Sequence, residues 1–208
     1  ALIDLGYWGR REGGRYAGYH RIAVNGLHPT AYFQRRRHGP ERFVRLGLPT
    51  CRPRQPGRHI LLAGMSAKAA WVFDLAPEEW ERATVAALRT VTDRPIRYRA
   101  KPSWDAASRI EGTEWTDAGR PLAEQLADCH AVVTHHSHVA IEAIMSGIPV
   151  FVVDGVARPV SNGMALDRIE SPELPDAGRL VQWLWDIAWT QWLVEEIRHG
   201  APWRHLIA

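Results

Sequence analysis

The chain has 208 residues, of which 46% are hydrophobic, and its formal net charge is +3. This length suits one full domain with an extra segment, or two small domains, and the apolar content excludes general disorder. No apolar run reaches the roughly 18 residues that a bilayer-spanning helix needs, and the first residues lack the pattern of a signal peptide. Cys51 and Cys129 form neither a disulfide framework nor a metal cluster, so we expect a reducing, cytoplasmic location.

The first 56 residues show little regular pattern. Residues 2–6 are typical of the end of a strand, residues 19–24 alternate like a short strand, and Asn25-Gly26 is typical of a turn. Residues 40–56 contain four prolines and many arginines, which is typical of a linker. We interpret residues 1–56 as the remnant of an N-terminal domain followed by a linker, and a truncated chain is the alternative interpretation.

Arginine supplies nearly all of the positive charge, because Lys68 and Lys101 are the only lysines. A GC-rich genome explains this excess, and so does a phosphate-rich partner, because guanidinium groups bind phosphate oxygens in pairs. The run Arg35-Arg36-Arg37-His38 lies beside Tyr32 and Phe33, and it is the segment most typical of nucleic-acid binding. A solvated loop is the alternative interpretation of that run.

A regular pattern begins at residue 57. Short apolar runs predict four buried strands, over residues 59–64, 95–100, 130–134 and 148–153. Helices are expected between them, over residues 77–88, 121–127 and 137–146, and one long helix is expected over 177–199. Gly147 suits the position after a helix end, and residues 104–120 are expected to form an irregular connection.

This alternation of strands and helices predicts an α/β domain over residues 57–208, a Rossmann-like parallel sheet with helices on both faces. In such sheets ligands bind beyond the carboxyl ends of the strands, next to helix N-termini. Four segments follow the predicted strands: Gly64-Met65-Ser66, Lys101-Pro102, His135-His136-Ser137 and Asp154-Gly155.

The segment His135-His136-Ser137 leads from a strand into a helix. The first turn of a helix offers unpaired N–H groups and a positive dipole end, which attract a phosphate. The Ser137 hydroxyl and the two imidazoles add hydrogen-bonding groups there. The alternative interpretation is that Ser137 only caps its helix.

Glu142 is the one charged residue of the otherwise apolar segment 139–145. Burying a carboxylate without a partner is costly, so a buried Glu142 would require a partner. A ribose diol would supply two hydroxyl donors to it. An exposed helix face is the alternative interpretation.

Residues 133–150 resemble the nucleotide-sugar-binding signature of GT-B-type glycosyltransferases. Capsular-polysaccharide-type transferases and nucleotide-sugar 2-epimerases share this order of strand, His/Ser turn, Glu142-Ala143, small residue, Gly147-x-Pro149 and strand. The resemblance extends over about residues 57–208, which would then be the C-terminal half of a GT-B fold.

The resemblance implies a nucleoside-diphosphate sugar as donor and requires no cofactor. Its diphosphate would contact the turn residues His135, His136 and Ser137, the basic strand end at Arg99 and Lys101, and the first glycine-bearing loop at Gly64 and Ser66. Its ribose would contact Glu142.

Residues 1–56 would then belong to the acceptor-side domain and are much shorter than such a domain normally is. The first candidate for a base that deprotonates the acceptor is Asp4, and His20 and His28 are alternatives. The acceptor stays open between a glycan and modified phage DNA, because the excess of arginine suits a nucleic acid, and the chain also resembles bacteriophage proteins in style. The alternative functions are a nucleotide-sugar 2-epimerase or hydrolase and a nucleotide-binding module without catalysis.

Two further patterns have structural interpretations. Histidine is a common metal ligand, and His135, His136 and His138 lie close together in the sequence. However, adjacent residues of a strand point to opposite sides, and no Cys or acid accompanies these histidines. We therefore expect no metal. Trp185, Trp189 and Trp192 fall on one stripe of the predicted last helix, which favours core packing over docking to a membrane surface.

Overall fold

The structure, a computed structural model, describes residues 1–11, 15, 17–30, 37–104, 106–117 and 119–207. The chain forms two compact units. Unit 1 consists of Ala1–Thr50 and Asp176–Ala208, and unit 2 consists of Cys51–Pro175. The arginine-rich residues Arg35 and Arg36 and the neighbouring aromatic residues lie outside the described residues.

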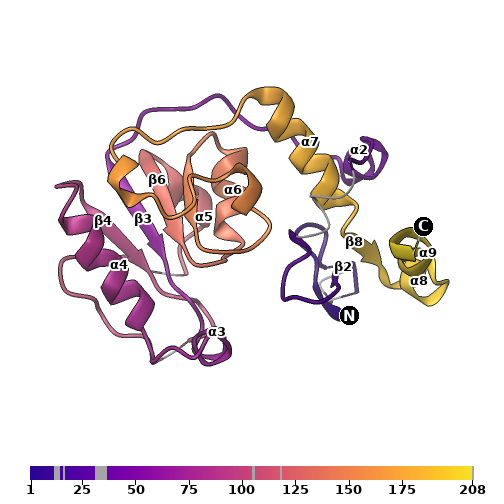
Figure 1. Ribbon diagram of the computed structural model, residues 1–208, viewed down its shortest axis with the longest axis horizontal. Coiled ribbons are helices and arrows are strands. Elements are labelled where there is room, and N and C mark those ends of the chain that lie inside the picture. The colour runs from indigo at the N-terminus through magenta and orange to yellow at the C-terminus, as the bar shows by residue number, and fades with distance from the viewer. Residues whose placement is uncertain (12–14, 16, 31–36, 105, 118, 208) are drawn as a thin grey trace. The chain divides into compact units, whose positions relative to one another are not determined.

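Unit 2 contains a sheet of five parallel strands, which confirms the predicted fold class (Figure 1). The strands are β3 (His59–Ala63), β4 (Ile96–Arg99), β5 (Glu114–Trp115), β6 (Cys129–Thr134) and β7 (Val150–Val152). Their order across the sheet is β5-β4-β3-β6-β7. The chain therefore adds β4 and β5 on one side of β3, and then crosses over and adds β6 and β7 on the other side, as in Rossmann-type sheets.

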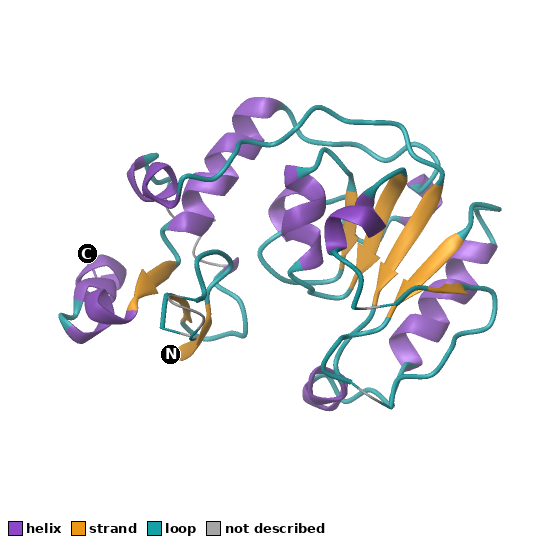
Figure 2. Cartoon of the chain, turned by 180° about the vertical axis from the view of Figure 1, so that it is seen from behind, coloured by secondary structure: helices purple, strands orange, loops and turns teal. Residues whose placement is uncertain are grey.

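Helices cover both faces of this sheet (Figure 2). The helices of unit 2 are α3 (Ala67–Val72), α4 (Glu79–Arg89), α5 (Leu122–Leu126) and α6 (Val139–Met145), with short 3-10 turns η1 (Arg158–Val160) and η2 (Leu166–Arg168). Gly147 follows α6 with a φ of 78°, and a Cβ there would lie 2.3 Å from the carbonyl oxygen of Pro53. Glycine at this position thus ends the helix as expected and also permits a close backbone contact.

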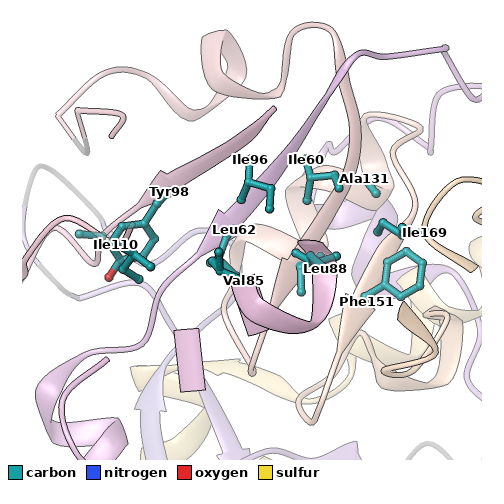
Figure 3. Close-up of a cluster of buried hydrophobic side chains, with 12 residues drawn as sticks. Ile60, Leu62, Val85, Leu88, Ile96, Tyr98, Ile110, Ala131, Phe151 and Ile169 are labelled. Carbon is teal, nitrogen blue, oxygen red and sulfur yellow. The ribbon is translucent and has the colours of Figure 1, made fainter. Parts of the chain in front are cut away.

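One cluster of the core of unit 2 lies between the sheet and α4 (Figure 3). Alternate residues of the strands point to this face because successive side chains of a strand point to opposite sides. They form one cluster with two residues of α4, Val85 and Leu88. The residues of α6 lie outside this cluster, although Ile141 and Ile144 are fully buried. The second helix layer therefore covers the opposite face.

Two elements of unit 2 depart from the sequence prediction. The expected irregular connection over 104–120 contains β5, a strand of two residues that pairs with Arg97 and Tyr98 of β4. Helix α3 was not predicted. Both elements are too short to show a hydrophobic period, and β5 has exposed residues only, so neither leaves a pattern in the sequence.

Unit 1 contains an antiparallel sheet of β1 (Leu2–Leu5), β2 (Tyr19–Ala23) and β8 (Gln191–Leu193), in the order β1-β2-β8. Its helices are α2 (Glu41–Leu46), α7 (Ala177–Ala188), α8 (Val194–Arg198) and α9 (Ala201–Ile207). The prediction of a linker over 40–56 is therefore wrong where α2 forms.

The prediction of one long helix over 177–199 is also wrong. Helix α7 ends at Ala188, and the chain then pairs with β2, where Trp192 lies opposite His20. The buried guanidinium of Arg42 donates to the carbonyl oxygens of Ala188 and Gln191, which have no helical partner at this break.

These pairings join the end of the chain to its beginning. Arg42 forms an ion pair with Glu196 at 2.8 Å, and His38 contacts Asp186 at 2.9 Å. Residues 176–208 are therefore part of unit 1, whereas the sequence placed them in the domain 57–208. Trp192 is 4% exposed, in agreement with the expected packing role. Among the described residues no helix is both long and apolar enough to cross a membrane.

We expect Leu88→Ala to lower the free energy of unfolding by about 2–5 kcal/mol, because Leu88 is fully buried between α4 and the sheet. Urea unfolding followed by circular dichroism measures this change. Val91→Ala is the control, because Val91 follows the same helix and is 37% exposed. Equal stability of the two variants would contradict the assignment of the core.

Candidate functional site

The strand order of unit 2 reverses between β3 and β6, which are neighbours in the sheet. At their carboxyl ends Ala63 lies beside Thr134 on one side and beside Arg99 on the other. The segments that follow these strands therefore start from one edge of the sheet. Rossmann-type sheets bind their ligands at this position, because the connections diverge there.

The two histidines after β6 are in direct contact. The Nδ1 atoms of His135 and His136 are 2.9 Å apart, so one ring donates a proton and the other accepts it. His135 is 6% exposed, and its ring centroid lies 4.4 Å from that of Phe73 and 5.6 Å from that of Trp80. Burial lowers the pKa of His135, and the negative charge of Asp154 opposes this effect. The net effect favours the neutral form of His135.

Backbone hydrogen bonds hold His135 in place. Its carbonyl oxygen accepts from the N–H groups of Val153 and Asp154, at 3.1 and 2.9 Å. The end of β7 thus fixes the turn that follows β6. Gly155 packs against the same turn, because a Cβ at this position would lie 3.4 Å from the carbonyl oxygen of His136.

Arg99 and Glu142 interact electrostatically at the same edge. Burial lowers the pKa of the half-buried Arg99 guanidinium, and the negative charges of Glu142 and Asp117 oppose this effect. Arg99 stays charged, because an arginine side chain does not lose its proton at neutral pH. Lys101 follows β4 and is half-buried. The structure therefore brings a cation and a carboxylate close enough to interact.

Glu142 is exposed, whereas the neighbouring Ile141 and Ala143 are buried. The expectation that burial forces a partner on Glu142 is therefore wrong. The carboxylate lies on the exposed side of α6 and interacts with the charge of Arg99.

Ser137 lies one residue before His138, the N-cap residue of α6, which makes no side-chain capping hydrogen bond. The Oγ of Ser137 accepts a hydrogen bond from the N–H of Val139 at 3.3 Å, and its carbonyl oxygen accepts from Ala140 at 3.1 Å. Helix α6 begins at Val139, two residues later than expected. Capping was the alternative interpretation of Ser137. A hydroxyl that accepts one bond still has its own proton to donate.

A buried acid forms a hydrogen bond with the loop after β3, and the sequence analysis did not identify it. The N–H of Met65 donates to the Oε1 atom of Glu81 at 2.6 Å. A Cβ on Gly64 would lie 3.0 Å from the hydroxyl oxygen of Tyr98 and 3.2 Å from that Oε1 atom, so this packing favours glycine. Ser66 caps α3 by accepting from the N–H of Ala69 at 3.2 Å. These contacts give Gly64 and Ser66 structural roles.

Sequence reasoning missed Glu81, although a signal for it exists. Glu81, Val85 and Leu88 lie at helical spacing on the face of α4 that points to the core. An acid at such a position is buried, and Glu81 is 1% exposed. Burial raises the pKa of Glu81, while the hydrogen bond from Met65 opposes this rise.

The two candidate bases lie in unit 1. Asp4 is an exposed residue of β1 and forms an ion pair with Arg21 at 2.6 Å. The Nδ1 atom of His20, on β2, lies 3.0 Å from the carbonyl oxygen of Gly18, so the neutral ring has its proton on Nδ1 and its lone pair on Nε2. The Nδ1 atom of the alternative base His28 is 3.4 Å from the guanidinium of Arg21.

The described residues contain no group of three or more His, Cys, Asp or Glu side chains placed to hold a metal ion. The three neighbouring histidines therefore do not form such a group within the part of the chain that the structure describes.

Comparison with known proteins gives structural neighbours only. No family model matches the chain, and no curated protein matches it. A solved structure of Thermosulfurimonas dismutans KpsC, a β-Kdo 2,7-transferase, is similar with a TM-score of 0.48 and 16% identity, over 79% of this chain and 54% of that one. A β-Kdo 2,4-transferase structure of the same protein has a TM-score of 0.45 and 14% identity, over 71% and 51%. The chain spans about half the length of both structures.

The raised pKa of Glu81 predicts how stability depends on pH. The protonated form is favoured in the folded chain, so its stabilisation is fully present below the pKa of an unfolded glutamate, roughly 4.3, and is lost as the pH rises through the folded value. Glu81→Gln keeps an oxygen to accept from Met65 but does not ionise.

We therefore expect the free energy of unfolding of the unmodified chain to fall relative to that of Glu81→Gln as the pH rises from about 4 to about 7. Urea unfolding at a series of pH values measures the difference. Glu111→Gln, which changes an exposed carboxylate, should follow the unmodified chain. A constant difference across the pH range would show that Glu81 ionises normally.

Proposed function

We propose that the protein is a glycosyltransferase, which transfers a sugar from a nucleoside-diphosphate sugar to an acceptor. In this proposal unit 2 binds the nucleoside-diphosphate sugar. One observation carries this proposal: cationic, imidazole and carboxylate side chains gather at the carboxyl edge of the sheet where the strand order reverses. The resemblance of residues 133–150 to the GT-B signature supports it.

The diphosphate is the part of the donor that this edge suits best. Arg99 and Lys101 at the end of β4 would bring positive charge to it, and guanidinium groups bind phosphate oxygens in pairs. His135, His136 and the proton of the Ser137 hydroxyl would add donors from the turn after β6. Gly64 and Ser66 would lie next to the ligand. The N–H of Met65, between them, would not bind the ligand, because it already donates to Glu81.

The ribose is assigned to Glu142. Its carboxylate is exposed on α6 and interacts with the charge of Arg99, so one ligand could contact the phosphate-binding and the ribose-binding residue together. A carboxylate accepts from both hydroxyls of a ribose diol.

The same charges would assist the reaction. When the bond between the sugar and the diphosphate breaks, negative charge grows on the departing nucleoside diphosphate. Fixed cations and N–H donors stabilise that charge without having to reorganise. No step needs a cofactor.

A screen of donors tests the proposal. The full chain is incubated with UDP-, GDP-, CDP- and ADP-sugars and with an activated Kdo donor, and its melting temperature is measured. Release of the free nucleotide is then assayed with and without candidate acceptors, glycans and DNA. Release that depends on an acceptor supports a transferase. Stabilisation without turnover would instead indicate a binding module, and hydrolysis or epimerisation without an acceptor would indicate the epimerase class.

We expect Glu142→Ala to weaken binding of the stabilising nucleotide sugar about 10- to 150-fold, because hydrogen bonds to a charged group contribute about 1.5–3 kcal/mol. Calorimetry gives the dissociation constants. Glu111→Ala is the matched control, because this exposed carboxylate precedes β5 and so lies toward the opposite edge of the parallel sheet. Equal affinity of Glu142→Ala and the unmodified chain would remove the ribose assignment.

Asp4 and His20 remain the proposed bases for an inverting transfer. The carboxylate of Asp4 is paired with Arg21, while the neutral His20 ring has a lone pair on Nε2. We expect one of the variants Asp4→Asn and His20→Gln to lose turnover by at least about 100-fold while keeping its affinity for the nucleotide, as removal of a general base does. Unchanged turnover in both variants would exclude both residues.

A further inference from the structure

We propose that His135 and His136 act as one unit in which His136 carries the proton that neutralises the anionic donor, and His135 is the positioning residue that orients it. This inference rests on the proposed function and deepens it, because it assigns different roles to two residues that the sequence treats alike.

The contact between the rings limits how they can be protonated. With the Nδ1 atoms 2.9 Å apart, one proton lies between them. Two protons there would make the N–H groups collide, and none would set two lone pairs against each other. The pair therefore accommodates a single positive charge, and a second charge would break the contact.

The surroundings determine which ring takes that charge. His135 is buried beside the apolar rings of Phe73, from the end of α3, and Trp80, from α4. Charging it would require removing an imidazolium from water, and burial accordingly lowers its pKa. His136 is half-buried and keeps part of its hydration.

The charged group after β7 does not reverse the effect of burial on His135. Asp154, after β7, favours a charge on His135 but does not overcome the effect of burial. Other titratable groups that the structure describes at this edge of the sheet are Arg99 and Lys101 at the end of β4, Asp117 after β5, and His138 and Glu142 at the beginning of α6. The positive residues among them disfavour a charge on either ring, and the negative donor would reverse that effect.

Orientation follows from the shared proton. A charged His136 donates its Nδ1–H to the Nδ1 lone pair of His135, which is then the neutral tautomer with its proton on Nε2. Because the carbonyl of His135 is held by Val153 and Asp154, this contact fixes the direction of the second N–H of His136. Binding of an anion should therefore take up a proton at His136.

The first measurement needs no donor. Long-range 1H–15N NMR of the full chain reports the tautomer and charge of each imidazole as the pH changes. We expect His135 to stay neutral, with its proton on Nε2, through the pH range in which His136 becomes charged. If His135 charges first, or if the two rings titrate independently, the inference is overturned even where a donor binds.

The second measurement adds an anion. Sulfate is the probe because it does not titrate in this range, and it should raise the pH at which His136 loses its proton. His136→Gln should abolish the pH dependence of sulfate affinity, and His138→Gln, which alters the third imidazole of this segment, should retain it. Equal pH dependence in both variants contradicts the inference.

Two substitutions of His135 separate positioning from packing. The side chain of His135→Asn can still accept from the Nδ1–H of His136, whereas that of His135→Phe cannot. We expect His135→Phe to weaken sulfate binding on the order of tenfold at pH 6, and His135→Asn to restore part of that loss. Equal affinity of His135→Phe and the unmodified chain overturns the positioning role, and failure of nucleotide sugars to bind while these results hold would overturn only the proposed function.

Discussion

The reversal of strand order at β3 is the constraint on which the candidate site depends. Because β4 and β6 pair with β3 on its two sides, the carboxyl ends of three parallel strands meet at one edge. Residues far apart in the sequence, such as Arg99 and His135, reach this edge only through that pairing. The loop after β3 and the turn after β6 then diverge, which is the arrangement that gives Rossmann-type sheets their ligand position.

Solvation divides the polar residues at this edge into two kinds. Glu81 and His135 are buried and have partners within the chain, at Met65 and His136. Such groups hold their neighbours in place, because breaking their hydrogen bonds would leave a polar atom without water. Glu142 is exposed and His136 is half-buried, so solvent reaches both side chains. The buried residues position the backbone and the rings, and the more exposed ones are those that we propose for ligand recognition.

The fold of unit 2 could be predicted well from the sequence, and that of unit 1 could not. Buried parallel strands are continuous apolar runs, so β3 and β6 are visible as such. The end of α7 at Ala188 has no local cause, because the following residues keep a helical pattern of tryptophans. There the pairing of β8 with β2 and the hydrogen bonds from Arg42 decide the structure. These contacts join residues far apart in the sequence: 146 positions separate Arg42 from Ala188, and 172 separate His20 from Trp192.

For the candidate site, the sequence by itself determined which chemical groups follow each strand, since the His135–Ser137 turn and the end of β4 come directly after apolar runs. Only the tertiary structure decided how solvent reaches them. It left Glu142 exposed, buried His135, and turned Glu81 toward the loop after β3. The physical reason is that a side chain's hydration depends on which elements pack over it, and packing joins residues that no local pattern connects.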